Sequence, residues 1–162
     1  MIYVLFVCLG NICRSPMAEG LFIHLVREKG LESQFRIDSC GTGGWHSGER
    51  ADPRMRSTAA EHGIELPSFA RKVRLDDFEE FDYILAMDES NYQDLLDLQA
   101  QVPKGEAQLF KMRHFDTQGK DTDVPDPYYG GRAGFERVFE MLDRSCKGLL
   151  DHIRSELEVA KK

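Results

Sequence analysis

The order of three segments at the start of the chain is the strongest constraint on the fold. Residues 2–7 are continuously apolar and mostly β-branched or aromatic, which predicts a strand buried on both faces. A short loop follows at residues 8–15, and Pro16 then opens a helical pattern, for which Ser15 is the predicted N-cap. This order directs backbone N–H groups and the positive end of a helix toward one point, which favours a bound anion.

Strand and helix patterns alternate through the rest of the chain. Further strands are predicted at residues 35–39, 81–87 and 107–112. Helices are predicted from Pro16 to Gly30, from Asp52 to Gly63, from Asp88 to Ala100 and from Arg132 onward, with a helical turn at 76–80, an irregular stretch at 64–74 and a fraying tail at 160–162. This alternation indicates an α/β fold, a four-stranded parallel sheet with helices on both faces. In such sheets the ligand site lies at the carboxyl ends of the strands.

Length and composition indicate a soluble globular protein. A chain of 162 residues suits a single domain, residues 1–162, with a sizeable core. The formal net charge of −7 argues against nucleic-acid binding, so any attraction for a phosphate has to be local. The apolar start of the chain is too short to span a bilayer and follows no basic region. We therefore expect a cytoplasmic protein that does not bind a membrane, with its four cysteines reduced.

The loop after the first predicted strand has the residues of a thiolate held in an anion cradle. Cys8 stands at the strand end, where a helix N-terminus, converging N–H groups and Arg14 all favour its ionised form. The planar fork of Arg14 matches two phosphate oxygens at once. Gly10 lets the backbone curl close to a ligand, and Asn11 tolerates a left-handed conformation. Cradle, thiolate and clamp together suggest transfer of a phosphoryl group to sulfur.

Two other roles are open to Cys8. A cysteine at a strand end is more often a core residue, but the pattern Cys-x5-Arg-Ser, with glycine and asparagine inside it and a helix start after it, favours a reactive site. A zinc site formed with Cys13 has an unusual spacing and no clustered His or Cys partners elsewhere. The loop also lacks the Gly-Lys-Ser/Thr of a nucleotide P-loop. We therefore expect neither a metal nor a cofactor.

Four stretches of the chain together resemble the low-molecular-weight protein tyrosine phosphatases: residues 7–16 (VCLGNICRSP), Asp38-Ser39, residues 81–88 (FDYILAMD) and residues 126–130 (DPYYG). The resemblance covers essentially the whole chain. It implies a four-stranded parallel sheet with the phosphatase loop after the first strand, which the strand and helix patterns indicate independently. It also implies a cysteine-dependent enzyme that hydrolyses phosphotyrosine in proteins.

The resemblance implies roles in the reaction for three residues. Cys8 matches the nucleophile that forms a phosphocysteine intermediate, and Arg14 matches the residue that binds the equatorial phosphate oxygens. Asp126 matches the general acid that protonates the leaving phenolate and later activates water. A phenol has a pKa of about 10, so its anion leaves poorly without that proton. Nothing near Asp126 in the sequence places it beside Cys8, and an aspartate before proline is otherwise usually a turn residue.

A supporting network and a binding crevice are implied in the same way. Asn11 and Ser15 match polar residues that hold the loop in shape, Ser39 matches a further member, and Ser68 stands where the family often has a histidine, which implies a shorter or water-filled network. The implied substrate-binding residues come from the loop and from aromatic walls: Leu9, Gly10, Asn11, Ile12, Cys13, Ser15, Trp45, Tyr128 and Tyr129.

Aromatic walls give the crevice the depth that suits a phenyl ring, although Trp45 also fits a loop that is simply packed. Cys13 matches a second loop cysteine that can form a disulfide with the nucleophile, which would make inactivation by oxidants reversible; it also fits a structural role. His62 is predicted to end a helix, where the dipole favours it, rather than to join the network.

Other activities share this fold and loop. Arsenate reductases relay electrons through further cysteines past the third strand, and none stands between Cys40 and Cys146. Phosphoarginine phosphatases are expected to carry threonine in place of Ile12 and fewer aromatic residues after Asp-Pro. A phosphate-binding module without catalysis is expected to lack one of the three catalytic residues. The predicted partner is a tyrosine-phosphorylated protein, with phosphate or another oxyanion in the loop, and the chain is expected to be a monomer or a weak homodimer.

Overall fold

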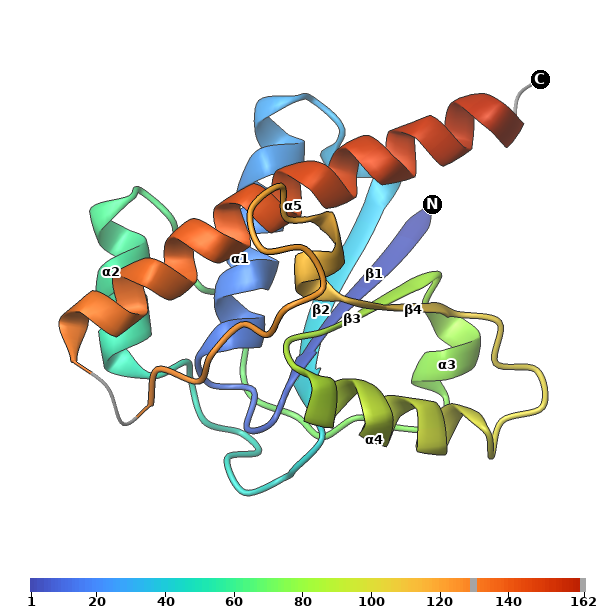
Figure 1. Ribbon diagram of the computed structural model, residues 1–162, viewed down its shortest axis with the longest axis horizontal. Helices are drawn as coiled ribbons and strands as arrows, with labels where there is room; N and C mark the ends of the chain where they lie inside the picture. Colours follow the sequence, from blue (N-terminus) through green and yellow to red (C-terminus); the bar gives the residue numbers. More distant parts are fainter. Residues whose placement is uncertain (129–130, 161–162) are drawn as a thin grey trace.

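Four parallel strands form the centre of the protein (Figure 1), seen in a computed structural model that describes residues 1–128 and 131–160. The strands are β1 (Ile2–Cys8), β2 (Phe35–Gly41), β3 (Tyr83–Ala86) and β4 (Gln108–Lys111), and they lie in the order β2-β1-β3-β4. All three neighbouring pairs are parallel. The predicted α/β class and four-stranded parallel sheet are therefore confirmed, although β3 begins at Tyr83 rather than at residue 81.

Helices cover both faces of this sheet. They are α1 (Arg14–Glu28), α2 (Pro53–Glu61), α3 (Asp77–Glu80), α4 (Glu89–Gln99), α5 (Arg132–Ala160) and the short 3-10 helices η1 (Glu32–Gln34) and η2 (Met112–Phe115). Figure 1 shows α1, α2 and α5 on one side and α3 and α4 on the other. None of the helices in the described part of the chain is long and apolar enough to cross a membrane.

The apolar run of β1 is buried because it faces a core on each side. Val4 and Phe6 pack in one cluster with residues of α1, α2 and α5. Leu5 and Val7 pack in the other cluster, with residues of α3 and α4. All four are completely buried, which explains why the strand is continuously apolar instead of alternating.

Two predicted helix starts are confirmed by their capping bonds. Asp52 is the N-cap of α2 and accepts a hydrogen bond from the Arg54 backbone N–H at 2.8 Å. Asp88 is the N-cap of α4 and accepts one from the Asn91 N–H, also at 2.8 Å. These carboxylates satisfy N–H groups that the helix itself leaves unpaired.

Ser15 is not the N-cap of α1, so that prediction is wrong. The helix begins at Arg14, two residues before the predicted start at Pro16, and its N-cap is Cys13, with no capping bond from a side chain. The Cys13 carbonyl already accepts from the Met17 N–H at 3.2 Å, which places Ser15 inside the first turn. Its hydroxyl is thereby free of the capping role and points back into the loop that precedes the helix.

Residues 64–74 are irregular, as predicted. Isolated bridges attach this segment to the rest of the chain, from Phe69 to Arg50 and from Lys72 to Gly41 at the end of β2. Ala160, predicted to fray, is the last residue of α5, and residues 161–162 lie outside the described part of the chain.

Candidate active site

A cavity of about 260 Å³ lies at the carboxyl end of β1. Its walls come from the loop after β1, the loop after β2 and the segment that precedes α5: Cys8, Leu9, Gly10, Ile12, Cys13, Arg14, Trp45, His46, Asp126 and Tyr128. Predicted site residues from three distant parts of the sequence therefore meet in one place. The predicted Asn11 and Ser15 are buried and do not line the cavity, and Tyr129 lies outside the described residues.

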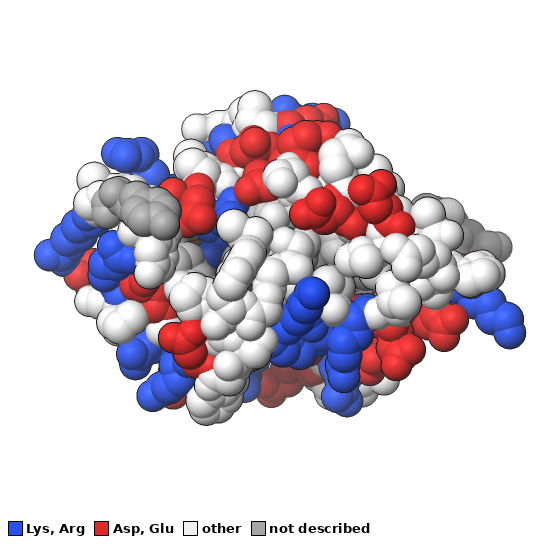
Figure 2. All heavy atoms as spheres, turned by 90° about the horizontal axis from the view of Figure 1, so that it is seen from below, with Lys and Arg blue, Asp and Glu red and all other residues white. Residues whose placement is uncertain are grey.

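Figure 2 views the molecule from this edge of the sheet. Acidic side chains gather at the top of the view, whereas basic ones lie mainly along its left and lower sides. With a net charge of −7, the protein as a whole does not attract an anion. An anion in the cavity has to be held by Arg14 and by the N–H groups of the loop, which lie within it.

Cys8 is the last residue of β1 and is surrounded by donors. The Asn11 backbone N–H donates to its Sγ at 3.2 Å, and Ser15 Oγ lies 3.0 Å from the same atom. Asn11 Nδ2 donates to Ser15 Oγ at 2.8 Å, which leaves the serine proton for Cys8 or for the Cys40 carbonyl, at a longer 3.4 Å. The Cys8 sulfur thus lies among hydrogen-bond donors and close to the start of α1.

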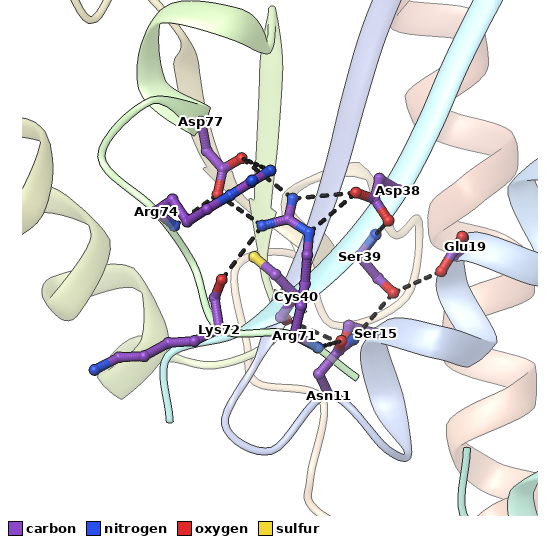
Figure 3. A network of polar contacts seen from close by, with 10 residues as sticks. All are labelled: Asn11, Ser15, Glu19, Asp38, Ser39, Cys40, Arg71, Lys72, Arg74 and Asp77. Atoms are coloured by element: carbon purple, nitrogen blue, oxygen red, sulfur yellow. Dashed lines mark hydrogen bonds and ion pairs between the residues drawn. The ribbon is translucent and has the colours of Figure 1, made fainter. Parts of the chain in front are cut away.

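A buried network holds the loop in this shape (Figure 3). Asn11 has a left-handed backbone, with φ of 57°, and its side chain is hydrogen-bonded on both sides. Its Nδ2 donates to Ser15 and also to Ser39 Oγ, the latter at 3.0 Å, while its Oδ1 accepts from the Arg71 backbone N–H at 3.0 Å. The loop conformation is therefore fixed by groups from β2 and from the irregular segment at 64–74.

The network continues to a buried carboxyl that the sequence patterns did not single out. Ser39 Oγ donates to Glu19 Oε1 at 2.5 Å. The pKa of Glu19 is raised to about 7, because the effect of burial exceeds that of the hydrogen bonds from Ser39 and Ser68, which lower it. Ser68, which stands where the family often has a histidine, therefore reaches the same carboxyl through its hydroxyl. A glutamate within an apolar helical stretch is the only signal that marks Glu19 in the sequence.

Arg71 extends the network on its other side, as Figure 3 shows. Its guanidinium donates to both oxygens of Asp77, at 3.0 and 3.1 Å, and to Asp38 at 3.1 Å. Asp77 is completely buried. This ion pair holds Arg71, whose backbone N–H donates to the Asn11 side chain. It therefore supports the loop from outside the cavity. No sequence motif marks Arg71 or Asp77.

Arg14 is fixed by two acceptors. Its Nη1 donates to Asp88 Oδ2 at 2.7 Å and to the Val124 carbonyl at 3.0 Å. The side chain is only 3% exposed, yet it lines the cavity. Held on one side, the planar guanidinium presents its other N–H groups as a fork suited to an oxyanion. Asp88, predicted only as a helix cap, therefore also orients Arg14.

Asp126 lies at the opening of the cavity and is 43% exposed. Its Oδ2 is 3.7 Å from Arg14 Nη2, and its Oδ1 accepts from the Tyr128 backbone N–H at 3.0 Å. The Val124 N–H donates to the Met87 carbonyl at 2.8 Å, which ties this segment to the end of β3. A carboxyl in this position can exchange a proton with a group bound beside Cys8.

The remaining walls are largely aromatic. Trp45 is 70% exposed and shares the cavity wall with Tyr128 and with His46, whose Nδ1 lies 2.6 Å from Glu49 Oε2. Trp45 is therefore not a packed loop residue, the alternative that the sequence left open. His46 was not singled out in the sequence, where only the glycines around it mark the loop.

Cys13 and His62 lie in surroundings that differ from those of Cys8. Burial raises the pKa of the Cys13 thiol far above its usual range, so it remains protonated. All four cysteines are free, and the described residues hold no group of three or more His, Cys, Asp or Glu side chains that could bind a metal ion. His62 is the C-cap of α2, as predicted, and stacks on Phe139 at a ring distance of 3.7 Å.

The site combines a cysteine at the end of a parallel strand, a loop lined with N–H groups, an arginine and a carboxyl. This combination defines a class of phosphatases that use a cysteine thiolate. Residues 3–159 match the family model described as low molecular weight phosphotyrosine protein phosphatase. The chain belongs to this family. The prediction of a cysteine-dependent phosphatase enzyme is thereby confirmed.

Relatives and solved structures agree with this membership. A low molecular weight protein-tyrosine-phosphatase of Streptomyces coelicolor is 45% identical over 157 residues, which cover 96% of this chain and 95% of that protein. The crystal structure of a protein tyrosine phosphatase from Entamoeba histolytica with Hepes in the active site has a TM-score of 0.89 at 43% identity, covering 96% of this chain and 99% of that one. A Drosophila arginine phosphatase has a TM-score of 0.88 at 34% identity, with 93% and 96% covered.

Proposed function

We propose that this enzyme hydrolyses phosphotyrosine in proteins through a phosphocysteine intermediate. The observation that carries the proposal is the meeting of Cys8, Arg14 and Asp126 in one cavity. The three side chains supply a nucleophile, a phosphate clamp and a proton donor, which together suffice for transfer of a phosphoryl group to sulfur and then to water. The reaction as proposed needs no metal and no cofactor.

In the first step the Cys8 thiolate attacks phosphorus. The S–P bond forms while the bond between phosphorus and the phenolic oxygen breaks, and Asp126 gives its proton to that oxygen. Arg14 and the loop N–H groups hold the non-bridging oxygens, where negative charge is concentrated. This step requires Asp126 to carry its proton when the substrate binds.

In the second step water attacks the phosphorus of the phosphocysteine. Asp126, now ionised, takes one proton from the water, and the S–P bond breaks to release inorganic phosphate and the thiolate. Ser15 Oγ, at 3.0 Å from Cys8 Sγ, stabilises the departing sulfur anion by donating its proton in a hydrogen bond. Both steps use the same three side chains, and the enzyme returns to its starting state.

Phosphotyrosine is favoured over phosphoarginine by the cavity walls. Tyr128 and Trp45 present aromatic surface beside Cys8, which suits a phenyl ring. Ile12 lines the cavity where the arginine phosphatases are expected to carry threonine. Phosphoarginine is the second candidate substrate, because the Drosophila arginine phosphatase has nearly the same fold as this chain. The absence of cysteines between Cys40 and Cys146 argues against an electron relay to arsenate.

Rapid-quench trapping tests the mechanism. We expect a phosphorylated Cys8 within one turnover of a phosphotyrosine peptide and none in the Cys8→Ser variant, which should also lack turnover. Turnover by the native protein without a trapped phosphocysteine would remove Cys8 from its role. The same protein assayed with peptides carrying phosphotyrosine, phosphoserine or phosphoarginine, and with arsenate, should favour phosphotyrosine. Faster turnover of phosphoarginine would reverse the substrate assignment while leaving the mechanism intact.

A further inference from the structure

The start of α2 contacts both the loop after β1 and residues 126–128, which carry Asp126. The proposed mechanism requires these two segments to stay together. Asp52, the N-cap of α2, donates its backbone N–H to the Ile12 carbonyl in the loop after β1, at 2.8 Å. Its carboxylate accepts from Arg54 Nε at 3.1 Å and from Arg54 Nη2 at 3.0 Å. Asp52 is only 8% exposed, so the plane of the Arg54 guanidinium is fixed from a buried point next to the loop.

The charges of this pair are both present at neutral pH. Burial alone would raise the pKa of Asp52, but hydrogen bonds from Arg54 hold it below its usual value. A bidentate pair of this kind restrains the guanidinium in direction as well as in distance. Arg54 is therefore held in one orientation, although its side chain is half exposed to water.

The fixed guanidinium contacts two aromatic rings. Arg54 Cζ lies 5.2 Å from the centre of the Tyr128 ring and 4.8 Å from the centre of the Phe135 ring. Both distances fall within the range of cation–π contacts. Phe135 belongs to α5 and is almost completely buried, so one contact ties Arg54 to the core. The other contact is with the segment that carries Asp126.

Tyr128 passes this restraint on to Asp126. Its backbone N–H donates to Asp126 Oδ1 at 3.0 Å, and Asp126 Oδ2 lies 3.7 Å from Arg14 Nη2. A closed path of contacts thus runs from the loop through Asp52 and Arg54 to Tyr128 and Asp126, and back to the loop at Arg14. Since Asp126 is half exposed, its neighbours rather than its own burial set its direction.

We infer that Arg54 is the positioning residue for the general acid. It holds residues 126–128 so that the Asp126 carboxyl faces the oxygen that leaves phosphorus when Cys8 attacks. Arg54 makes no contact with the reacting atoms and acts through Tyr128. Because this role presupposes that Asp126 donates the proton, it rests on the proposed function. If Arg54 has this role, its replacement should slow the reaction most for substrates with a poor leaving group, since only a poor leaving group needs the proton.

Two substrates and three variants measure that dependence through kcat/KM, which reports the transfer to Cys8. Phenyl phosphate expels an oxygen that requires protonation, and 2,4-dinitrophenyl phosphate expels one that does not. Arg54→Met keeps the length of the side chain without its charge. Arg54→Lys keeps the charge but neither the flat face nor the fork. Arg56→Lys is the matched control, because Arg56 is on the same helix and its Nε donates to the Ala51 carbonyl instead.

We expect both Arg54 variants to lose on the order of tenfold in kcat/KM with phenyl phosphate, a part of the roughly 10²- to 10⁴-fold that a positioned acid supplies. With the dinitrophenyl ester we expect less than about a twofold loss, and with Arg56→Lys no difference between the esters. Equal losses on the two esters would show that Arg54 attracts phosphate or supports the fold, and would overturn the inference. A wild-type ratio in Arg54→Lys would overturn it too, because charge alone would then suffice.

Asp126→Asn, assayed in the same series, separates this inference from the proposed function. If this variant shows no dependence on the leaving group, Asp126 is not the general acid and the proposed function fails with it. If Asp126→Asn shows the dependence and the Arg54 variants do not, only the positioning role is refuted. Should Arg54→Met fail to fold, Arg54→Lys gives the same comparison.

Discussion

Glu19 should make the stability of the native protein fall as the pH rises from acid to neutral. The side chain is on α1, 4% exposed, and faces Ser39 and Ser68 as hydrogen-bond donors, with Asp38 and Arg71 as the charged groups nearby. Burial raises its pKa from 4.5 to about 7. The folded protein therefore binds a proton between these values that the unfolded chain releases.

The size and sign of the effect follow from that difference. The stabilisation is fully present below about pH 4.5 and is lost as the pH rises through about 7, because the carboxyl must then be buried as an anion. Each unit between two pKa values corresponds to about 1.4 kcal/mol. The whole interval from 4.5 to about 7 thus corresponds to about 3 kcal/mol of unfolding free energy.

The Glu19→Gln variant isolates this contribution. Glutamine keeps an oxygen that can accept the Ser39 hydrogen bond but cannot ionise, so the variant should lose none of its stability through this group. Urea unfolding of both proteins from about pH 4 to about pH 8 should show the variant gaining on the native protein, by about 3 kcal/mol at neutral pH and above. Other titrating groups contribute to both proteins and cancel in the difference.

A difference that stays flat across this range would refute the reasoning, because Glu19 would then bind its proton equally in both states. A difference of the opposite sign would mean that the anion is stabilised by the fold. Glu65→Gln is the matched control: this glutamate is exposed, and its replacement should give a flat difference.

Four further substitutions test the loop and the packing of α5. Asn11→Ala removes three side-chain hydrogen bonds and leaves alanine with a φ of 57°, so we expect a loss of about 3 kcal/mol in urea unfolding; a loss below about 1 kcal/mol would contradict this. Asp116→Asn removes a buried charge that pairs with two arginines and should cost about 3 kcal/mol, while kcat/KM stays unchanged because Asp116 does not line the cavity. Gly148→Ala forces a methyl group against the Phe115 carbonyl and should cost about 3 kcal/mol. Gly134→Ala, whose nearest neighbour would be 3.9 Å away, should stabilise the helix by up to about 1 kcal/mol; the reverse order of Tm would refute the packing argument.

The parts of the fold that could be predicted from the sequence are those that local interactions determine. The apolar run at residues 2–7 became β1 because both of its faces are buried, a condition that composition alone records. Asp52 and Asp88 became helix caps because a capping bond spans only two or three residues. The same local reasoning placed Cys8 at a strand end and Arg14 beside it, since strand, loop and helix are consecutive in the chain.

Interactions between distant segments decided the rest. Ser15 was misassigned because its hydroxyl bonds to Asn11 and Cys8 rather than to the helix backbone, a choice that depends on the folded loop. Asp126 reaches the cavity only because the segment before α5 is tied to the end of β3. No periodicity or spacing encodes that approach.

The loop that carries Cys8 and Arg14 and the layered sheet beneath it could thus be predicted from the sequence, because they arise from neighbouring residues and from the burial of whole strands. Packing between distant segments placed the Asp126 carboxyl in the cavity that Cys8 lines, buried Glu19 with a pKa of about 7, and brought Arg54 against Tyr128. Each of these is a contact between side chains brought together by packing, and packing depends on the shape of the complete core.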